Sequence, residues 1–462
     1  MEIRTGVLNP SDKLTEVAKL QSTRMERIDT ANHGLEIEQS TSIDSQDPDV
    51  PLANSITEMI DNLSPLSPNC CIYRVPKKYR NINEKAYTPQ IVSIGPLHHG
   101  KENLQAMEEH KLRYLQVFLN RTRMGMKGCI RVIREWEERA RKCYAESIML
   151  SSDEFVKMIL LDSSFIIEAI WRYNFFMLKD QTDYLNRPHM IVAVRLDMIL
   201  LENQLPFFVL EDLFNITFNS YPNTQLSFLM LSINYFKSLM LIKDTHKVIS
   251  SCEVNHFLDL LRSCHLPSSL RSLPAGSVKF VAVCNTTELK EVGMKFKRGS
   301  SNHLLDIQCT MDVLEIPHLC IHDGTEPLLR NLIAFEQCHY TLNSYIMDYV
   351  SFMDCLIDTA KDVDILIQNG ITENQLSYSS SVSCLFNGLT TEMIWQAQNY
   401  YFYGICEDLN AYCRVPWHRW KVTLKRDYFS TPWRIISTIA AVILLCLTLI
   451  QAMCSIASLK TK

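Results

Sequence analysis

The chain has 462 residues, of which 47% are hydrophobic and 21% are charged, a balance typical of a globular protein with material for a large core. Its formal net charge of −5 gives no electrostatic reason to expect binding to nucleic acid. The 16 cysteines are spread along the chain without a C-x-x-C pair, so neither a zinc ribbon nor a thioredoxin-like motif is supported.

The first 69 residues are polar, and the stretch "STSIDSQDPDVPLANS" has the composition of a disordered linker. We therefore expect residues 1–69 to be disordered, apart from one short helix that Ser55 caps with Glu58 three residues later. The first 20 residues contain acidic side chains and lack the apolar core of a secretory signal. Without export, most cysteines should be reduced thiols that pack as small hydrophobic side chains.

Residues 70–430 are expected to form one large, mainly helical domain, because apolar residues recur at helical spacing along most of this region. The helix expected over 154–173 is apolar on nearly all sides and should be central. Between residues 278 and 322 apolar and polar residues alternate, which predicts a small antiparallel sheet. The expected helices cover residues 102–122, 131–149, 154–173, 189–214, 225–241, 253–262, 325–338, 342–369 and 382–412. The helix over 189–214 is expected to end or kink at Pro206.

Two adjacent histidines, His98 and His99, lie in the stretch "SIGPLHHGKENL". Adjacent side chains in a turn rarely converge on one ion, so the residues indicate a turn between Pro96 and Gly100. One imidazole is then expected to cap the following helix or to bond a backbone carbonyl. The alternative is a metal or catalytic site that recruits acidic side chains from the next helix.

The stretch "LLENQLPFFVL" places Glu202, Asn203 and Gln204 among apolar residues. A buried carboxylate there could act as a general acid or base with a raised pKa. We expect instead a structural hydrogen-bond network with arginine or backbone groups, because most buried polar groups are satisfied in that way. The chain lacks a nucleophile elbow, a Walker loop and a G-x-G-x-x-G fingerprint, so we predict no enzyme and assign no catalytic or cofactor-binding residue.

Further possible metal ligands occur in "IPHLCIHDGTEPLLRNLIAFEQCHY". They are His318, Cys320, His322, Asp323, Cys338 and His339. The first three alternate along a predicted strand, a spacing that could hold zinc. Cys338 and His339 are adjacent rather than spaced as a ligand pair, which favours a strand end with partly exposed histidines, and we assign no metal site. The motif "DGTEPLLRN" predicts a turn and a helix start, with Glu326 and Arg330 as an i,i+4 ion pair.

The end of the chain carries a membrane-anchor signal. Ile435–Leu459 comprises 25 uncharged residues, which as a helix would span about 37 Å and cross a hydrocarbon core of about 30 Å. The anchor, with its flank, is placed at residues 431–459. Basic and aromatic residues before it are expected to lie at the membrane interface and to hold the large domain in the cytosol. These interface residues are Trp417, Arg419, Trp420, Lys421, Lys425, Arg426, Tyr428, Trp433 and Arg434.

Long segments of the chain, in order, resemble the land-plant family called domain of unknown function 247. They include "IYRVPKKYRNINEKAYTPQIVSIGPLHHGKENLQAMEEHK", "DMILLENQLPFFVLEDL", "VLEIPHLCIHDGTEPLLRNLIAFEQC" and "LKRDYFSTPWRIISTIAAVILLCLTLIQ". The resemblance runs from about Cys71 to the C-terminus. It implies a plasma-membrane protein with one C-terminal helix, and it carries no established catalytic or metal residue. Some members of the family are implicated in grass self-incompatibility, and others are linked to growth or defence.

Together the residues and the resemblance predict a membrane-anchored interaction or recognition module that acts in self-incompatibility or signalling. Its expected partners are the lipid bilayer, through Ile435–Leu459, and an unidentified protein. An enzyme of unrecognised type that works through His98, His99 or Glu202 is the alternative. No cofactor and no nucleic acid are expected.

Overall fold

The computed structural model describes residues 49–61, 67–122, 124–176, 184–218, 227–241, 253–266, 280–340, 342–394, 399–415 and 432–460. The chain divides into two units, residues 1–66 and 67–462. The described part of the first unit is helix α2 (Asp49–Asp61), all of whose side chains are exposed. It begins six residues before the cap predicted at Ser55. The sequence predicts disorder also for residues 1–48 and 62–66, which lie outside the described residues.

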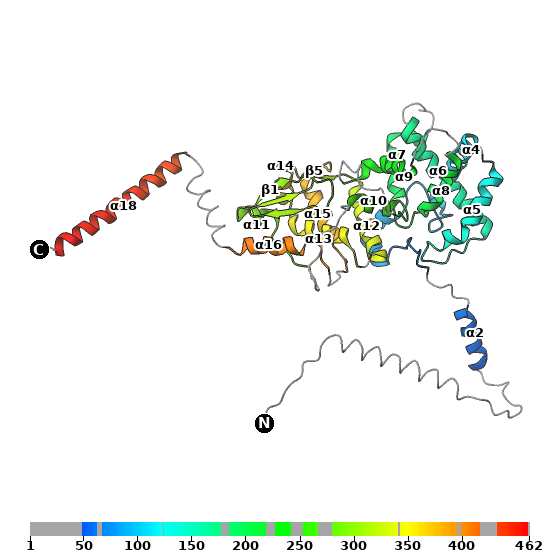
Figure 1. Cartoon of the computed structure of the whole chain (residues 1–462), viewed down its shortest axis with the longest axis horizontal. Coiled ribbons are helices and arrows are strands. Elements are labelled where there is room, and N and C mark those ends of the chain that lie inside the picture. The colour runs from blue at the N-terminus through cyan, green and yellow to red at the C-terminus, as the bar shows by residue number, and fades with distance from the viewer. Residues whose placement is uncertain are drawn as a thin grey trace, which may run out of the picture. The chain divides into compact units, whose positions relative to one another are not determined.

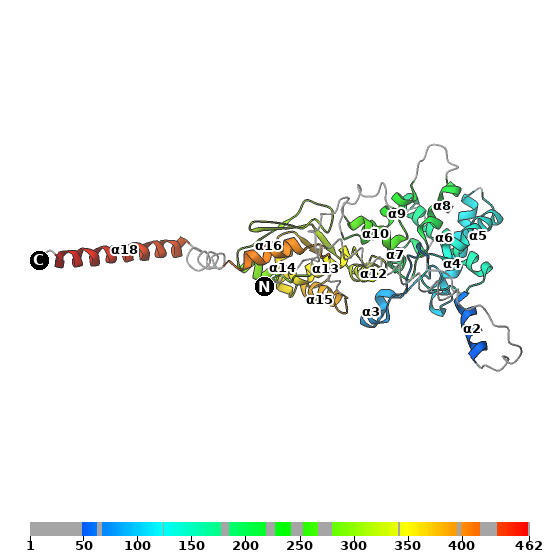
Figure 2. The ribbon, with the colours of Figure 1, turned by 60° about the horizontal axis from the view of Figure 1, so that its bottom comes forward.

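The N-terminal half of the second unit is a group of helices around α6 (Ser152–Phe176). α4, α5, α8 and α9 pack against α6, and most of the α6 side chains are buried, as its apolar sequence predicts (Figures 1 and 2). The α-helices are α3 (Lys77–Ile82), α4 (Ala106–Arg121), α5 (Met126–Arg141), α7 (Pro188–Met198), α8 (Phe207–Phe218), α9 (Phe228–Phe236) and α10 (Phe257–His265). The 3₁₀ helices are η1 (Glu84–Tyr87), η2 (Glu102–Leu104), η3 (Tyr184–Asn186) and η4 (Lys237–Leu239).

The C-terminal half combines helices with two small sheets, which lie together in both ribbon views (Figures 1 and 2). The helices are α11 (Thr286–Glu291), α12 (Thr325–His339), α13 (Tyr345–Leu356), α14 (Ala360–Gln368), α15 (Ser379–Leu389) and α16 (Tyr403–Cys413). The strands are β1 (Lys295–Arg298), β2 (Gln308–Thr310), β3 (Val313–Ile316), β4 (Leu319–Ile321) and β5 (Thr372–Asn374). The predicted mainly helical fold with a minor sheet is confirmed.

The strand pairing differs from the expected antiparallel sheet. In the order β1-β3-β2, β2 pairs with β3 antiparallel, but β1 pairs with β3 in parallel, with Phe296 opposite Leu314. β4 and β5 form a separate parallel pair. Helices α12, α13 and α14 lie between β4 and β5 in sequence, and a parallel pair requires such a crossover.

Three expected helices are each two helices in the structure. The helix predicted over 189–214 divides into α7 and α8, 342–369 into α13 and α14, and 382–412 into α15 and α16. Capping explains one division, because Thr359 and Asp362 form a capping box that begins α14. Pro206 directly precedes α8, and because proline has no backbone N–H it cannot donate the hydrogen bond that would continue a helix from α7.

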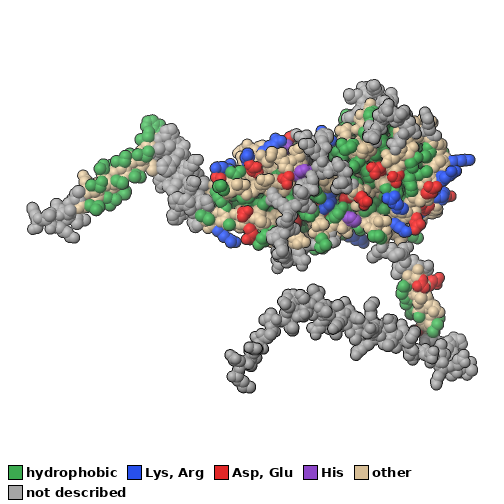
Figure 3. All heavy atoms as spheres, viewed as in Figure 1, with side chains coloured by type: hydrophobic (Ala, Val, Ile, Leu, Met, Phe, Trp, Pro, Cys, Tyr) green, Lys and Arg blue, Asp and Glu red, His purple; other side chains and the backbone are tan. Residues whose placement is uncertain are grey.

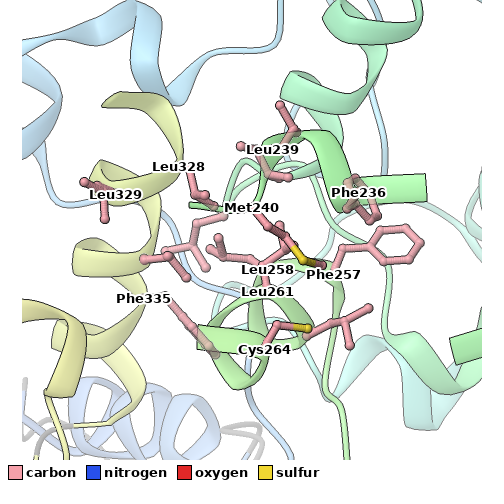
Figure 4. Close-up of a cluster of buried hydrophobic side chains, with 14 of the residues drawn as sticks. Phe236, Leu239, Met240, Phe257, Leu258, Leu261, Cys264, Leu328, Leu329 and Phe335 are labelled. Atoms are coloured by element: carbon pink, nitrogen blue, oxygen red, sulfur yellow. The ribbon is translucent and has the colours of Figure 1, made fainter. Parts of the chain in front are cut away.

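One hydrophobic core runs through the second unit, from Cys71 to Leu409. Figure 4 shows its middle, where the region around α9 and η4 meets α10 and α12. Phe257, Leu261 and Cys264 of α10 lie there beside Leu328 and Phe335 of α12, and all five are buried. The two halves of the second unit therefore share a core and fold as one body.

Helix α18 (Pro432–Lys460) is long and apolar, and its segment Ile436–Met453 meets the length and composition needed to cross a membrane. None of this 18-residue segment is buried against the protein, and hydrophobic side chains cover α18 in the space-filling view (Figure 3). Trp433 is 79% exposed at its start. The other interface residues of the prediction, from Trp417 to Tyr428, lie outside the described residues, as does the side chain of Arg434.

Candidate functional site

The loop between α7 and α8, residues 199–206, places a carboxylate inside the protein. Glu202 is 1% exposed. Its Oε1 accepts hydrogen bonds from the backbone N–H of Val75 (2.7 Å) and from Nη2 of Arg80 (2.5 Å). Its Oε2 lies 3.1 Å from Nε2 of His98 and 3.5 Å from Nη1 of Arg74. The structural network expected around Glu202 is confirmed.

His98 belongs to this network, which corrects the expectation that an imidazole from the pair caps a helix. The predicted turn is present, because the N–H of His99 donates to the carbonyl of Pro96 (3.3 Å) and Gly100 has φ +80°. The imidazole of His98 is nevertheless only 2% exposed and points to Glu202, whereas His99 is exposed. The two histidines therefore have different environments and do not form one site.

Asn203 attaches the same loop to residues 92–95, and the backbone of Gln204 lies close to Gly95. Asn203 accepts the N–H of Ile94 through Oδ1 (2.7 Å) and donates to the carbonyl of Val92 (3.0 Å). The carbonyl of Gln204 accepts the Tyr144 hydroxyl (3.0 Å). A Cβ added to Gly95 would lie 2.5 Å from that carbonyl oxygen, so only glycine permits this close approach.

A second buried carboxylate, Asp197 at the end of α7, holds the start of this segment. Its two oxygens accept the backbone N–H groups of Gln90 (2.9 Å), Ile91 (2.6 Å) and Val92 (2.8 Å). Residues 90–92 are outside regular strands, so the carboxylate replaces the partners that a sheet would provide. Segments 90–98 and 197–204 form one polar network, which we call the clasp. The sequence singles out His98 and Glu202 separately, without connecting them.

The electrostatics of the clasp favour an ionised Glu202 beside a neutral imidazole. Burial raises the pKa of Glu202, but His98, Arg80 and the Val75 N–H together lower it below its usual value. Burial lowers the pKa of His98 more than Glu202 raises it. For Asp197, burial raises the pKa to about 6 in spite of its three N–H donors. The clasp thus satisfies buried backbone groups, and this arrangement is suited to holding the fold.

The other possible ligands are dispersed. His318 Nε2 lies 3.7 Å from Glu373 Oε2, and Cys320 is buried in β4. The His339 ring stacks on Phe335, and its Nδ1 lies 3.0 Å from the Tyr73 hydroxyl. Among the described residues, no three His, Cys, Asp or Glu side chains lie close enough together to hold a metal ion. The predicted pair between Glu326 and Arg330 is confirmed, at 2.8 Å.

Described residues of the second unit border two surface grooves of several hundred Å³. The first has a volume of about 530 Å³ and is formed by residues 68–71, 206–208 and 253–255, with Arg139 and Cys143 at the end of α5. We call it the Arg139 groove. The second, of about 470 Å³, is bordered by His322, Asp323 and Glu326 on one side and by residues 380–385 of α15 on the other. Neither His98 nor Glu202 lines either groove.

The Arg139 groove was not found from the sequence. The guanidinium of Arg139 lies 3.6 Å from the ring centroid of Phe208, and the rings of Phe208 and Trp136 meet edge to face. An exposed arginine beside aromatic rings is typical of residues that dominate protein interfaces. The apolar run "LPFFVLEDLF" contains Phe208, but no local pattern shows that α5 lies opposite it.

Comparisons with known proteins agree with the resemblance in the sequence. Residues 72–447 match the model of the family described as "plant protein of unknown function", domain of unknown function 247. The chain is 25% identical to UPF0481 protein At3g47200 of Arabidopsis thaliana over 84% of this chain and 87% of that protein. It is 22% identical to Putative UPF0481 protein At3g02645 of Arabidopsis thaliana over 82% of this chain and 89% of that protein. No solved structure matches the chain.

Proposed function

The chain belongs to the plant family of unknown function that its residues 72–447 match, and from this premise we propose that it is a membrane-anchored recognition protein. In this proposal α18 crosses the plasma membrane, and the part of the second unit that precedes it, which we call the body, lies in the cytosol. The Arg139 groove binds a protein partner. Self-incompatibility and signalling are the settings in which such a module would act.

Support for the anchor comes from the contrast between α18 and the body. The central helix α6 is buried within the core, whereas the side chains of the α18 segment Ile436–Met453 have no protein contact that covers them. Exposing so many apolar side chains to water is unfavourable, by about 25 cal/mol for each Å² of apolar surface. A lipid environment removes that penalty, and this is the reason for assigning α18 to a bilayer.

The observation that carries the recognition half of the proposal is the composition of the Arg139 groove. Phe208, Leu229 and Val254 line it together with the charged side chains of Arg139, Glu211 and Glu253. A mostly polar surface that also carries aromatic and arginine side chains is usual in protein interfaces that form and dissociate. An enzyme acting through His98 or Glu202 has less support, because both side chains are buried and lie 3.1 Å from each other within the clasp.

The anchor is tested by removing it. A chain that ends before Trp433 should be released from membranes by alkaline carbonate, whereas the full chain should stay in the pellet, since it keeps the apolar helix. In sealed vesicles with the cytosolic face outward, protease should digest the body of the full chain. Retention of the shortened chain in the pellet, or protection of the body, would contradict the anchor or its orientation.

The partner site is tested by proximity labelling in plant cells with charge-reversal variants. Arg139→Glu should remove the specific labelled partner, because it replaces the cation over Phe208 with a like charge to Glu211 in the same groove. The matched control is Arg131→Glu, an exposed arginine of the same helix that does not line the groove. Identical labelling by the two variants would reject the groove as the recognition surface.

A further inference from the structure

We propose that Cys71 and Cys143, which lie side by side in the Arg139 groove, form a peroxide-sensitive thiol pair that closes into a reversible disulfide. Both are free thiols in the structure, and both line the groove. Both residues line the groove proposed for recognition, but their oxidation needs no protein partner, so the test below is independent of the test of the recognition site.

The backbone holds the two cysteines in register. The carbonyl of Cys143 accepts hydrogen bonds from the N–H groups of Cys71 and Ile72, both at 2.9 Å. The N–H of Ala145 donates to the carbonyl of Ile72 (2.9 Å), and Ile72 and Tyr144 form a parallel bridge. Chains paired in this way lie about 4.8 Å apart, within the Cα separation of about 4.4–6.8 Å that a disulfide needs.

The side chains meet as well, and their surroundings favour reaction at Cys143. The Cys143 thiol donates to the carbonyl of Arg139 (3.4 Å), and the neighbouring Cys71 thiol together with the charge of Arg139 lowers the pKa of Cys143 in spite of burial. Cys71 has a raised pKa and remains a protonated thiol. The ionisable side chains that line the same groove are Cys70, Arg139, Glu211, Glu253 and His339. Cys143 is also the more exposed of the two, at 6% against 2%, and it lies next to Arg139, so we assign Cys143 as the nucleophile and Cys71 as the resolving thiol.

The chemistry needs an oxidant, and hydrogen peroxide is the class of oxidant that we assign. The Cys143 thiolate attacks one peroxide oxygen, the O–O bond breaks, and Cys143 sulfenic acid and hydroxide form. The Cys71 sulfur then attacks the sulfenic sulfur, the S–O bond breaks, and the Cys71 proton and the leaving hydroxide form water. Two thiols are oxidised to one disulfide, and one peroxide is reduced to two water molecules. A cellular thiol reductant returns the pair to its starting state.

A second thiol pair in the same chain provides the matched control. Cys284 and Cys413 also interact through a side-chain hydrogen bond, and both are partly exposed. Burial and the neighbouring Cys284 raise the pKa of Cys413 to about 12, and Glu288 adds a like charge rather than a cation. At pH 7 Cys413 holds almost no thiolate, so oxidation that begins at Cys413 should be far slower than oxidation at Cys143, although Cys413 is more accessible.

The experiment treats the full chain, in detergent or in vesicles, with hydrogen peroxide and maps its peptides without reduction. We expect a linkage between Cys71 and Cys143 that a thiol reductant removes, formed at least tenfold faster than any linkage between Cys284 and Cys413. In Cys71→Ser the resolving thiol is absent, so the Cys143 sulfenic acid should persist and react with dimedone. Arg139→Gln should slow the oxidation several-fold, because the cation beside Cys143 is lost.

The peptide map of the unaltered chain decides the proposal even if a variant fails to fold. Preferential oxidation of Cys284 and Cys413, pairing of Cys143 with Cys70, or conversion of Cys143 to sulfinic acid without a linkage would each overturn it. Absence of dimedone labelling at Cys143 in a folded Cys71→Ser chain would also overturn it, since the sulfenic acid is the required intermediate.

Discussion

Replacing Glu202 with glutamine removes the charge at the centre of the clasp while preserving the volume of the side chain. Hydrogen bonds to an ionised group contribute about 1.5–3 kcal/mol each and neutral ones about 0.5–1.5 kcal/mol. The contacts to Val75 (2.7 Å) and Arg80 (2.5 Å) should therefore each weaken by about 1 kcal/mol. The amide N–H₂ would face Nε2 of His98, which costs about 1 kcal/mol more.

The sum is a loss of about 3 kcal/mol in the free energy of unfolding, at the lower end of the range for breaking a buried ion pair. The lower end is appropriate because the side chain of Arg80 is 21% exposed and that of Arg74 is 45% exposed, so water solvates both cations in the variant. Urea unfolding of the full chain in detergent, followed by tryptophan fluorescence, measures the loss as a shift of midpoint at constant slope.

Glu146→Gln is the matched control, because Glu146 pairs with the same Arg74 at 2.7 Å but both side chains are nearly half exposed. Its expected cost is below about 1 kcal/mol. The pKa of Glu202 is depressed, so its stabilisation is present above about pH 4.3 and disappears as the pH falls through the folded-state pKa. Equal midpoints for the two variants at pH 7 would refute the assignment of Glu202 as a stabilising charge.

Two further predictions concern single positions. Gly95→Ala should cost about 3 kcal/mol or more, because the new Cβ would lie 2.5 Å from the Gln204 carbonyl at φ +70°, whereas Gly100→Ala, at φ +80° with open space, should cost about 1 kcal/mol. Thermal unfolding compares them, and a larger loss for Gly100→Ala would contradict the close approach. Burial lowers the pKa of His265 to about 4, and its Nε2 accepts the Leu241 N–H, so the folded imidazole is neutral. Because the unfolded imidazole binds a proton near pH 6.5, the wild type should lose up to about 3 kcal/mol through this group as the pH falls to about 4. The His265→Asn variant should lose less free energy of unfolding between about pH 6.5 and about pH 4. If the urea midpoints of the wild type and the variant depend equally on pH, His265 is not buried in its neutral form.

Much of the fold could be predicted from the sequence, because helix periodicity, caps and apolar runs are local signals. The central position of α6, the start of α12 and the apolar length of α18 all follow from such signals. The break in 189–214 is predicted at Pro206, and α8 does begin directly after that residue, but α7 ends earlier than expected, at Met198. In the structure the side chains of Glu202, Asn203 and Gln204 bond groups far away in sequence, and that gain outweighs continuing the helix.

Local sequence patterns predict only part of the candidate site, because its contacts join positions that are far apart in the chain. For Glu202 the expected structural network is correct, because a carboxylate among apolar residues must find donors. For His98 and His99 the same reasoning predicted that one imidazole caps the next helix or bonds a backbone carbonyl. The neighbour of His98 is instead Glu202, and no spacing rule joins positions so far apart. The Arg139 groove depends likewise on α5 lying opposite the start of α8, which is a property of the packed chain.

The clasp also has a consequence for synthesis of the protein on the ribosome. The N–H groups of Gln90, Ile91 and Val92 have their acceptor in the Asp197 carboxylate, which lies 105 to 107 residues later in the chain. At about 5–20 residues per second, the ribosome needs roughly 5 to 20 seconds to deliver Asp197 after these residues. Segment 90–98 must therefore stay solvated, or held by a chaperone, while α4, α5 and α6 emerge. The N-terminal half of the second unit can therefore finish folding only after the loop that follows α7 has been synthesised. This point comes well before the hydrophobic helix α18 leaves the ribosome.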